Sequence, residues 1–176
     1  MTLSRVVFFS RNLAKETGSS QAEMVKAMLA ACVRHDSASG ITGAVLFDHR
    51  HFLQAIEGDR TLISHQLRAI FKDERQGGLT LMSFERIVKR EFRGWTIGYA
   101  GHDEALDRLY ITYGVLPEFD PSRLSESNAF QLLRDSCLLE SKYIQRSAPI
   151  NGPSQGTTMF PEQGAKENKP TIRGLS

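Results

Sequence analysis

The chain has 176 residues, of which 40% are hydrophobic and 24% are charged, a balance typical of a globular protein with one main domain. This excludes a wholly disordered or collagen-like chain, and no apolar run approaches the ~20 residues of a membrane helix. The 22 basic and 20 acidic residues leave a net charge of +2, so we expect neither nucleic acid nor a membrane as a partner. Cys32 and Cys137 lie far apart in a sequence without a secretory signal, which predicts reduced thiols in a cytoplasmic protein.

The first part of the chain alternates between strand and helix periodicity. Residues 3–9 are β-branched and aromatic and predict a strand. Ser20 and Glu23 form a capping box, so a helix is expected over about residues 20–34. Two short apolar runs on either side of a polar turn predict the strands of a hairpin, 41–47 and 51–57.

A second helix and two further strands complete this pattern. Asp59 can cap the helix, whose apolar residues recur at helical spacing until Gly77-Gly78, where we expect it to end. Strands are expected over 79–88 and around 96–100. A third helix, roughly 122–142, is long enough to dock on the exposed sheet face or on another subunit.

The order of these elements is β-α-β-β-α-β-β. It predicts an α+β, ferredoxin-like sheet with two helices on one face, followed by a C-terminal helical extension. Right-handed crossovers place the first strand beside the strand of Gln54 in the middle of the sheet. We expect a domain over 1–100, the helical extension over 101–146 and a flexible, proline-rich tail over 147–176.

Motifs for common chemistries are missing from the sequence. The chain has no P-loop, G-x-G-x-x-G or C-x-x-C pattern, so we expect no enzyme. His49 and His51 could bind a metal with a third ligand, but no such ligand follows at a recognisable spacing, which favours solvated turn residues. A short basic run favours a solvated strand edge over a nucleic-acid site, since stacking aromatics are few: Arg86, Lys89, Arg90 and Arg93.

Residues 40–58, GITGAVLFDHRHFLQAIEG, carry the most specific pattern in the chain. The G-I-T-G strand, the short hairpin and the F-L-Q-x-I-E-G strand resemble the BLUF family of blue-light sensors, which use a flavin. Asp73-Glu74-Arg75 and the F-x-x-W of Phe92 to Trp95 match that family in order and spacing. The resemblance covers about residues 2–100, including the strand order derived above.

The resemblance implies that a flavin (FAD or FMN) lies between the two helices, facing a glutamine on the third strand and a tyrosine on the first. Gln54 matches the glutamine, and strand alternation puts it on one face with Phe52 and Ile56. A glutamine held by backbone groups is the alternative. The tyrosine position, two before Ser10, is Phe8. Phenylalanine has no hydroxyl to bond Gln54 or to lose a proton, so we expect the usual photocycle to be lost or altered.

Three more family positions are matched in part. The flavin-holding asparagine is replaced by Asp36, whose ionised carboxylate only accepts hydrogen bonds and is expected to weaken flavin binding unless burial raises its pKa. His35 matches a position that stacks on the ring in some members. Both residues could instead be solvated at the helix end. Arg75 matches an arginine that can approach the flavin side chain, although the histidine that usually follows is Gln76.

The family tryptophan is matched by Trp95, whereas Ile97 stands where a methionine tied to signal output is common. Trp95 and Tyr99 are candidate substitute electron donors, but neither stands at the tyrosine's position.

These features predict a flavin-binding, sensor-like signalling protein with a lost or altered photocycle. The alternative is a flavin-free interaction or regulatory module derived from the family. A ferredoxin-like enzyme of the acylphosphatase kind is disfavoured, because no arginine-bearing phosphate loop joins strand and helix. Output would pass through a protein partner. Short family members commonly form homo-oligomers, so we expect one here, with the helix at 122–142 contributing.

Overall fold

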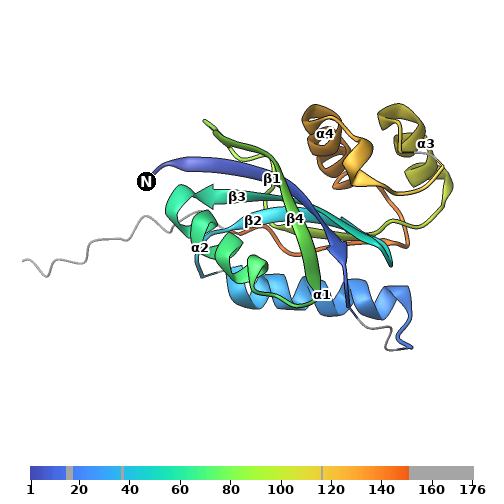
Figure 1. Ribbon diagram of the computed structural model, residues 1–176, viewed down its shortest axis with the longest axis horizontal. Helices are drawn as coiled ribbons and strands as arrows, with labels where there is room; N and C mark the ends of the chain where they lie inside the picture. The colour runs from blue at the N-terminus through green and yellow to red at the C-terminus, as the bar shows by residue number, and fades with distance from the viewer. Residues whose placement is uncertain (15–17, 37, 116, 151–176) are drawn as a thin grey trace, which may run out of the picture.

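The computed structural model describes residues 1–14, 18–36, 38–115 and 117–150, with only the backbone of His35 and Asp36. Within these residues, one six-stranded sheet lies between α-helices on both faces (Figure 1). The elements are β1 (Leu3–Asn12), α1 (Gln21–Asp36), β2 (Thr42–Phe47), β3 (His51–Asp59), α2 (Arg60–Phe71), β4 (Gln76–Arg86), β5 (Trp95–Tyr99), α3 (Glu104–Tyr113), the 3-10 turn η1 (Pro121–Arg123), α4 (Glu126–Ser136) and β6 (Ile144–Arg146).

The sheet has the strand order β4-β1-β3-β2-β5-β6. The expected neighbourhood of β1 and β3 in the middle of the sheet is confirmed, and the two strands run antiparallel. Only β2 and β5 pair in parallel among the described strands. Figure 1 shows α1 and α2 on one side of this sheet. The ferredoxin-like α+β arrangement predicted from the element order is therefore confirmed.

Both sheet-covering helices begin where side-chain caps predict. The backbone N–H of Ser20 donates to Glu23 Oε2 (2.7 Å), and the N–H of Glu23 donates to Ser20 Oγ (3.3 Å), which completes the capping box of α1. Asp59 caps α2, because its Oδ1 accepts from the N–H of Thr61 at 3.0 Å. These caps fix where each helix leaves the sheet edge.

The expected end of the second helix at Gly77-Gly78 is wrong. Helix α2 ends at Phe71, and the two glycines lie inside β4, which already begins at Gln76. Gly78 has φ +60°, a conformation that glycine adopts without steric cost, and it lies where the β1–β4 register shifts. The glycines therefore shape a bulged strand and not a helix end, and Gln76 becomes a sheet residue.

A single third helix over 122–142 is also wrong. Ser125 caps the shorter helix α4 by accepting from the N–H of Asn128 at 3.1 Å, and the chain then turns back to add β6 to the sheet edge. Helix α3 was not predicted. Its N-cap Asp103 and its C-cap Gly114, with φ +76°, are signals that the sequence does contain.

Helices α3 and α4 pack on the sheet face opposite α1 and α2 (Figure 1). Leu132 and Leu133 of α4 share a buried cluster with Leu53 and Ala55 of β3. Of the two docking options left open by the sequence, the sheet face is thus the one that α4 occupies. Residues 151–176 of the expected flexible tail lie outside the described residues. Its first residues are hydrogen-bonded, since the N–H of Ser147 donates to the carbonyl of Trp95 at 2.8 Å.

Candidate functional site

One row of side chains crosses the centre of the sheet on the face covered by α1 and α2. The strand registers align Phe8 of β1, Gln54 of β3, Val45 of β2 and Ile97 of β5. Phe8 is 0% exposed and Gln54 is 6% exposed. Phe8, Val45 and Ile97 share a buried cluster with side chains of both helices, Val25, Ile63 and Leu67. Gln54 thus places one amide within an apolar layer, as the strand alternation predicts.

Within the described residues, the amide of Gln54 is bonded to a side chain and not to the backbone groups that the alternative supposes. Its Nε2 donates to Gln76 Oε1 at 2.9 Å, and Ser10 Oγ donates to the same oxygen at 2.8 Å. Phe8 lies directly opposite Gln54 and has no polar atom to offer. Sequence reasoning missed the role of Gln76, because its contact with Gln54 depends on the bulged register of β4.

Trp95 lies one row away in the same buried cluster and is 3% exposed. Its six-membered ring leans over β2 at Gly43, where a Cβ atom would be 3.0 Å from Trp95 Cζ3. Among the residues that the structure describes, the buried Nε1 of Trp95 has no hydrogen-bond partner. Leaving such a donor unpaired costs about 1–3 kcal/mol, so this N–H offers a bond to a group entering the layer.

Tyr99 lies at the end of β5 and belongs to the same face, packed edge-on against Phe47 at 5.5 Å between ring centroids. Burial raises the pKa of Tyr99, and the charge of Asp48 raises it further. Tyr99 therefore keeps its phenolic proton over the whole neutral range.

Arg75, another predicted site residue, is bonded to a different part of the chain than Gln54. The side chain of Arg75 is 74% exposed and pairs with Asp73, with Nη2 and Oδ2 2.6 Å apart. This partner holds the pKa of Asp73 below its usual range. The side chains of His35 and Asp36 lie outside the described residues, although α1 reaches Asp36. Of the predicted site residues whose side chains the structure describes, Phe8, Gln54 and Trp95 are brought into one layer.

A buried ion pair lies on the opposite sheet face, and sequence reasoning missed it. Glu57 is 0% exposed, and its Oε1 accepts from Arg5 Nε at 2.8 Å. Its Oε2 accepts from the backbone N–H groups of Glu91 (2.8 Å) and Phe92 (3.0 Å). The guanidinium of Arg5 lies over the ring of Phe130 in α4, 3.8 Å from its centroid. The pair therefore joins β3, the segment before β5 and α4.

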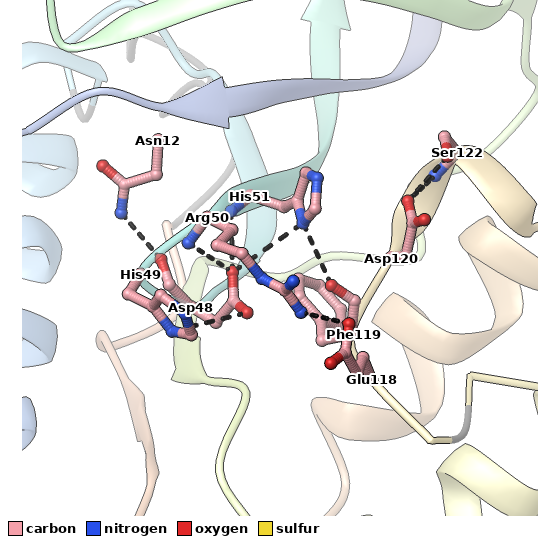
Figure 2. A network of polar contacts seen from close by, with 9 residues as sticks. All are labelled: Asn12, Asp48, His49, Arg50, His51, Glu118, Phe119, Asp120 and Ser122. Atoms are coloured by element: carbon pink, nitrogen blue, oxygen red, sulfur yellow. Dashed lines mark hydrogen bonds and ion pairs between the residues drawn. The ribbon is translucent and has the colours of Figure 1, made fainter.

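The histidines of the hairpin contribute to a different network (Figure 2). Nδ1 of His51 lies 3.0 Å from the carbonyl oxygen of Phe119, and the N–H of His51 donates to Asp48 Oδ1 at 2.6 Å. His49 Nδ1 is 3.8 Å from Asp48 Oδ2. In the described part of the chain, no group of three or more His, Cys, Asp and Glu residues could hold a metal ion. The network instead ties the hairpin to the segment before α4.

Arg90, one member of the basic run, holds parts of the fold together by hydrogen bonds. Arg90 donates to the carbonyl oxygens of Gly40 (2.6 Å) and Glu57 (2.7 Å) and to Thr42 Oγ1 (2.8 Å). Partial burial lowers the pKa of Arg90. Its charge is thus used in holding loops together at the start of β2.

Across residues 1–14, 18–36, 38–115 and 117–150, no helix has the length and apolar character required to cross a bilayer.

These features define a class of protein: an α+β sheet that carries one buried glutamine beneath a pair of helices. Residues 3–98 match the family model of BLUF, sensors of blue light using FAD. The chain belongs to this family of flavin-binding blue-light sensors. No match is found among curated protein sequences.

Solved structures with the same fold include several light sensors. BlsA in its photo-activated state is 19% identical, with a TM-score of 0.65 over 79% of this chain and 97% of that chain. The dark state of the BLUF protein BlrB is 24% identical, with a TM-score of 0.59 over 77% and 95%. BlrP1 of Klebsiella pneumoniae, in a complex with calcium and cyclic diGMP, is 16% identical, with a TM-score of 0.52 over 73% and 32%. This last match spans about a third of the BlrP1 chain.

Proposed function

We propose that this chain is a flavin-binding signalling protein, using FAD or FMN, whose usual photocycle is lost or altered. The observation that carries the proposal is the pair of Gln54 and Phe8, which lie opposite each other on the buried face under α1 and α2. The glutamine that the family uses is present in the expected layer. The phenol that should accompany it is replaced by a hydrocarbon ring.

The residues present fit a flat ring system with a polar edge. Phe8, Val45 and Ile97 supply apolar contact area, and Val25 and Ile63 of the two helices belong to the same buried cluster. The buried indole N–H of Trp95, which has no partner within the described residues, and the amide of Gln54 supply donors for ring carbonyl or nitrogen atoms. His35, Asp36 and Arg75 are proposed to hold the flavin at its edge and side chain, by resemblance to the family.

A bound flavin supplies an oxidising excited state under blue light. Phe8 cannot donate a proton to this excited state, because a phenyl ring has no acidic proton. It also has no hydroxyl to bond the amide of Gln54. Trp95 has an N–H and lies in the layer, but it is two strands away from β3 in the sheet order. Gln54 therefore has no proton source at the position where the family has its tyrosine.

The output proposed here is a protein contact and not a reaction of this chain. The match covers 32% of the BlrP1 chain, so the same fold also occurs as one part of a longer protein. The exposed sides of α3 and α4 are the proposed contact surface for a partner or for a second copy in a homo-oligomer. Cys32 and Cys137 are proposed to be reduced thiols of a cytoplasmic protein, as the sequence predicts.

Flavin binding can be tested through Trp95, the only tryptophan of the chain. Addition of FAD or FMN is expected to quench its emission, and gel filtration should recover a yellow protein. Asp107→Asn, an exposed change on α3 at the opposite sheet face, is the control and should bind equally well. Unchanged emission together with a colourless protein after gel filtration would contradict flavin binding.

A flavin-free regulatory module is the second candidate. It is favoured by the contacts of Gln54, whose Nε2 is already bonded to Gln76, which in turn is bonded to Ser10. One donor of the amide is thus already used within the chain. The same titration separates the two candidates, since a flavin-free module gives no quenching.

A further inference from the structure

Three polar side chains form a connected group within the apolar layer under α1 and α2. This polar triad consists of Ser10 on β1, Gln54 on β3 and Gln76 at the start of β4. Ser10 is 0% exposed and Gln54 is 6% exposed. Both donate to one atom, Gln76 Oε1, at 2.8 Å and 2.9 Å. A carbonyl oxygen has two lone pairs, so the two donors use its full capacity.

We infer that Gln76 is the positioning residue that sets the orientation of the Gln54 amide. An isolated glutamine amide can exchange its oxygen and nitrogen by rotating about the last side-chain bond. Here Ser10 and Gln54 both point a hydrogen at Gln76, which fixes the Gln76 carbonyl between them. Gln54 must then present Nε2 to Gln76 and keep Oε1 on its other side.

The backbone holds Gln76 firmly enough for this role. Its N–H donates to the carbonyl of Asp73 at 2.9 Å, and the residue is paired with Asn12 of β1. Arg75, the residue before it, is tied to Asp73 by a side-chain ion pair. Gln76 therefore extends over the sheet from a fixed point, and its side chain reaches past Ser10 to Gln54.

The triad also couples the two amides. If Gln54 alone rotated, its Oε1 would face Gln76 Oε1, and two carbonyl oxygens would meet without a hydrogen between them. If Gln76 rotates as well, its two N–H groups can serve Gln54 Oε1 and Ser10 Oγ, because a hydroxyl both donates and accepts. Rotation of Gln54 thus requires rotation of Gln76. Any bearing of this coupling on flavin rests on the proposed function, whereas the coupling itself can be measured without flavin.

Two substitutions at Gln76 separate positioning from simple packing. Gln76→Glu keeps acceptor oxygens for Ser10 and Gln54, whereas Gln76→Leu has similar bulk and no polar atom. Gln131→Leu is the matched control. It removes another glutamine–serine bond, from Gln131 Nε2 to Ser127 Oγ (3.0 Å) on α4, at the opposite sheet face.

The readout is hydrogen exchange of the Gln54 side-chain N–H groups by ¹⁵N NMR of the full chain, with the signals identified by their loss in Gln54→Glu. In the parent protein and in Gln131→Leu these hydrogens should exchange slowly. In Gln76→Leu exchange should be roughly tenfold faster, as expected for the loss of one hydrogen bond, and Gln76→Glu should keep the slow rate. Equal rates in the parent and Gln76→Leu, or equally fast rates in both Gln76 variants, would overturn the inference.

Ser10→Ala gives an independent test if Gln76→Leu does not fold. It removes the second donor, so exchange at Gln54 should rise in the same direction, and an unchanged rate would count against the inference. The visible spectrum of flavin-loaded protein is then compared between Gln76→Leu and Gln76→Glu. If no variant and no parent protein binds flavin, the proposed function fails while the exchange result stands.

Discussion

Phe8 and Gln54 lie directly opposite each other in the antiparallel pair of β1 and β3. A hydroxyl at the far end of the Phe8 ring would belong to the strand next to that of Gln54 and would lie within the same buried layer. The hydrocarbon ring there fills space, and Gln54 turns its donor to Gln76 at 2.9 Å instead. The proposed loss of the usual photocycle thus rests on one missing oxygen atom at Phe8.

The buried pair of Glu57 and Arg5 is expected to govern stability. Glu57→Gln leaves Arg5, whose side chain is only 10% exposed, with the half-exposed Glu85 (3.5 Å) as its one remaining ion-pair partner among the described residues, and removing one member of a buried pair costs about 3–5 kcal/mol. Denaturant unfolding measures this loss. Glu118→Gln breaks an exposed pair with Arg50, with side chains 64% and 43% exposed, and should shift the unfolding midpoint far less.

The same pair can be tested by a double-mutant cycle. Arg5→Met combined with Glu57→Gln should cost less than the sum of the single changes, because no unpaired charge remains. Additive losses would show that the ion pair does not act as a unit.

Gly43 is expected to control the position of Trp95. Gly43→Ala places a methyl group 2.3 Å from the carbonyl oxygen of Ala55 and 3.0 Å from Trp95 Cζ3, so the β3 backbone and the indole must both shift, and overpacking of this kind costs at least about 1–3 kcal/mol. The emission of the single tryptophan should change as its indole moves. Gly58→Ala is the control, since its methyl would approach Ile41 Cγ1 at 3.1 Å. An unchanged spectrum in Gly43→Ala would contradict the contact.

Two carboxylates that cap helices should make the free energy of unfolding fall at acidic pH. The N–H of Thr2 lowers the pKa of Asp59 below its ordinary 3.8, and the N–H of Ser20 lowers the pKa of Glu23 below 4.5. The unfolded chain then binds more protons, so the stabilisation is complete above the unfolded values and is lost as pH falls through the folded ones. Urea midpoints should drop from about pH 5 to about pH 3. In Asp59→Asn with Glu23→Gln, this drop should be smaller.

Asp36→Asn is expected to strengthen flavin binding. An asparagine amide can donate to a flavin carbonyl, whereas a carboxylate opposes it with negative charge. One recovered hydrogen bond corresponds to a roughly tenfold lower Kd, measured by quenching of Trp95. Equal affinity in Asp36→Asn and the parent chain would remove Asp36 from the site.

The sequence predicts the layer of the site well, because strand periodicity decides which residues share a face. Gln54 with Phe52 and Ile56, and the neighbouring first and third strands, follow from alternation and from the handedness of crossovers. What lies beyond local periodicity was missed. Gln76 reaches Gln54 only because β4 starts earlier and carries register shifts, and a long-range register is not encoded in a short window of sequence.

The C-terminal part shows the same limit. The cap signals Asp103, Gly114 and Ser125 lie in the sequence, but a leucine-rich stretch was interpreted as one long helix. Glu57 could have been noticed as a charged residue on the apolar side of β3 opposite Gln54. Its partner Arg5, by contrast, is 52 residues away, and only the fold brings them together.

The most direct test of the account compares the absorption of flavin-loaded parent chain, Phe8→Tyr and Phe9→Tyr before and after blue light. Phe9 follows Phe8 on β1 and packs on the opposite sheet face, so its variant adds the same hydroxyl in the wrong layer. We predict a red shift that recovers in darkness for Phe8→Tyr alone, with no shift in the parent or in Phe9→Tyr. A reversible red shift in the parent chain would contradict the account, because Phe8 would then not have removed the photocycle.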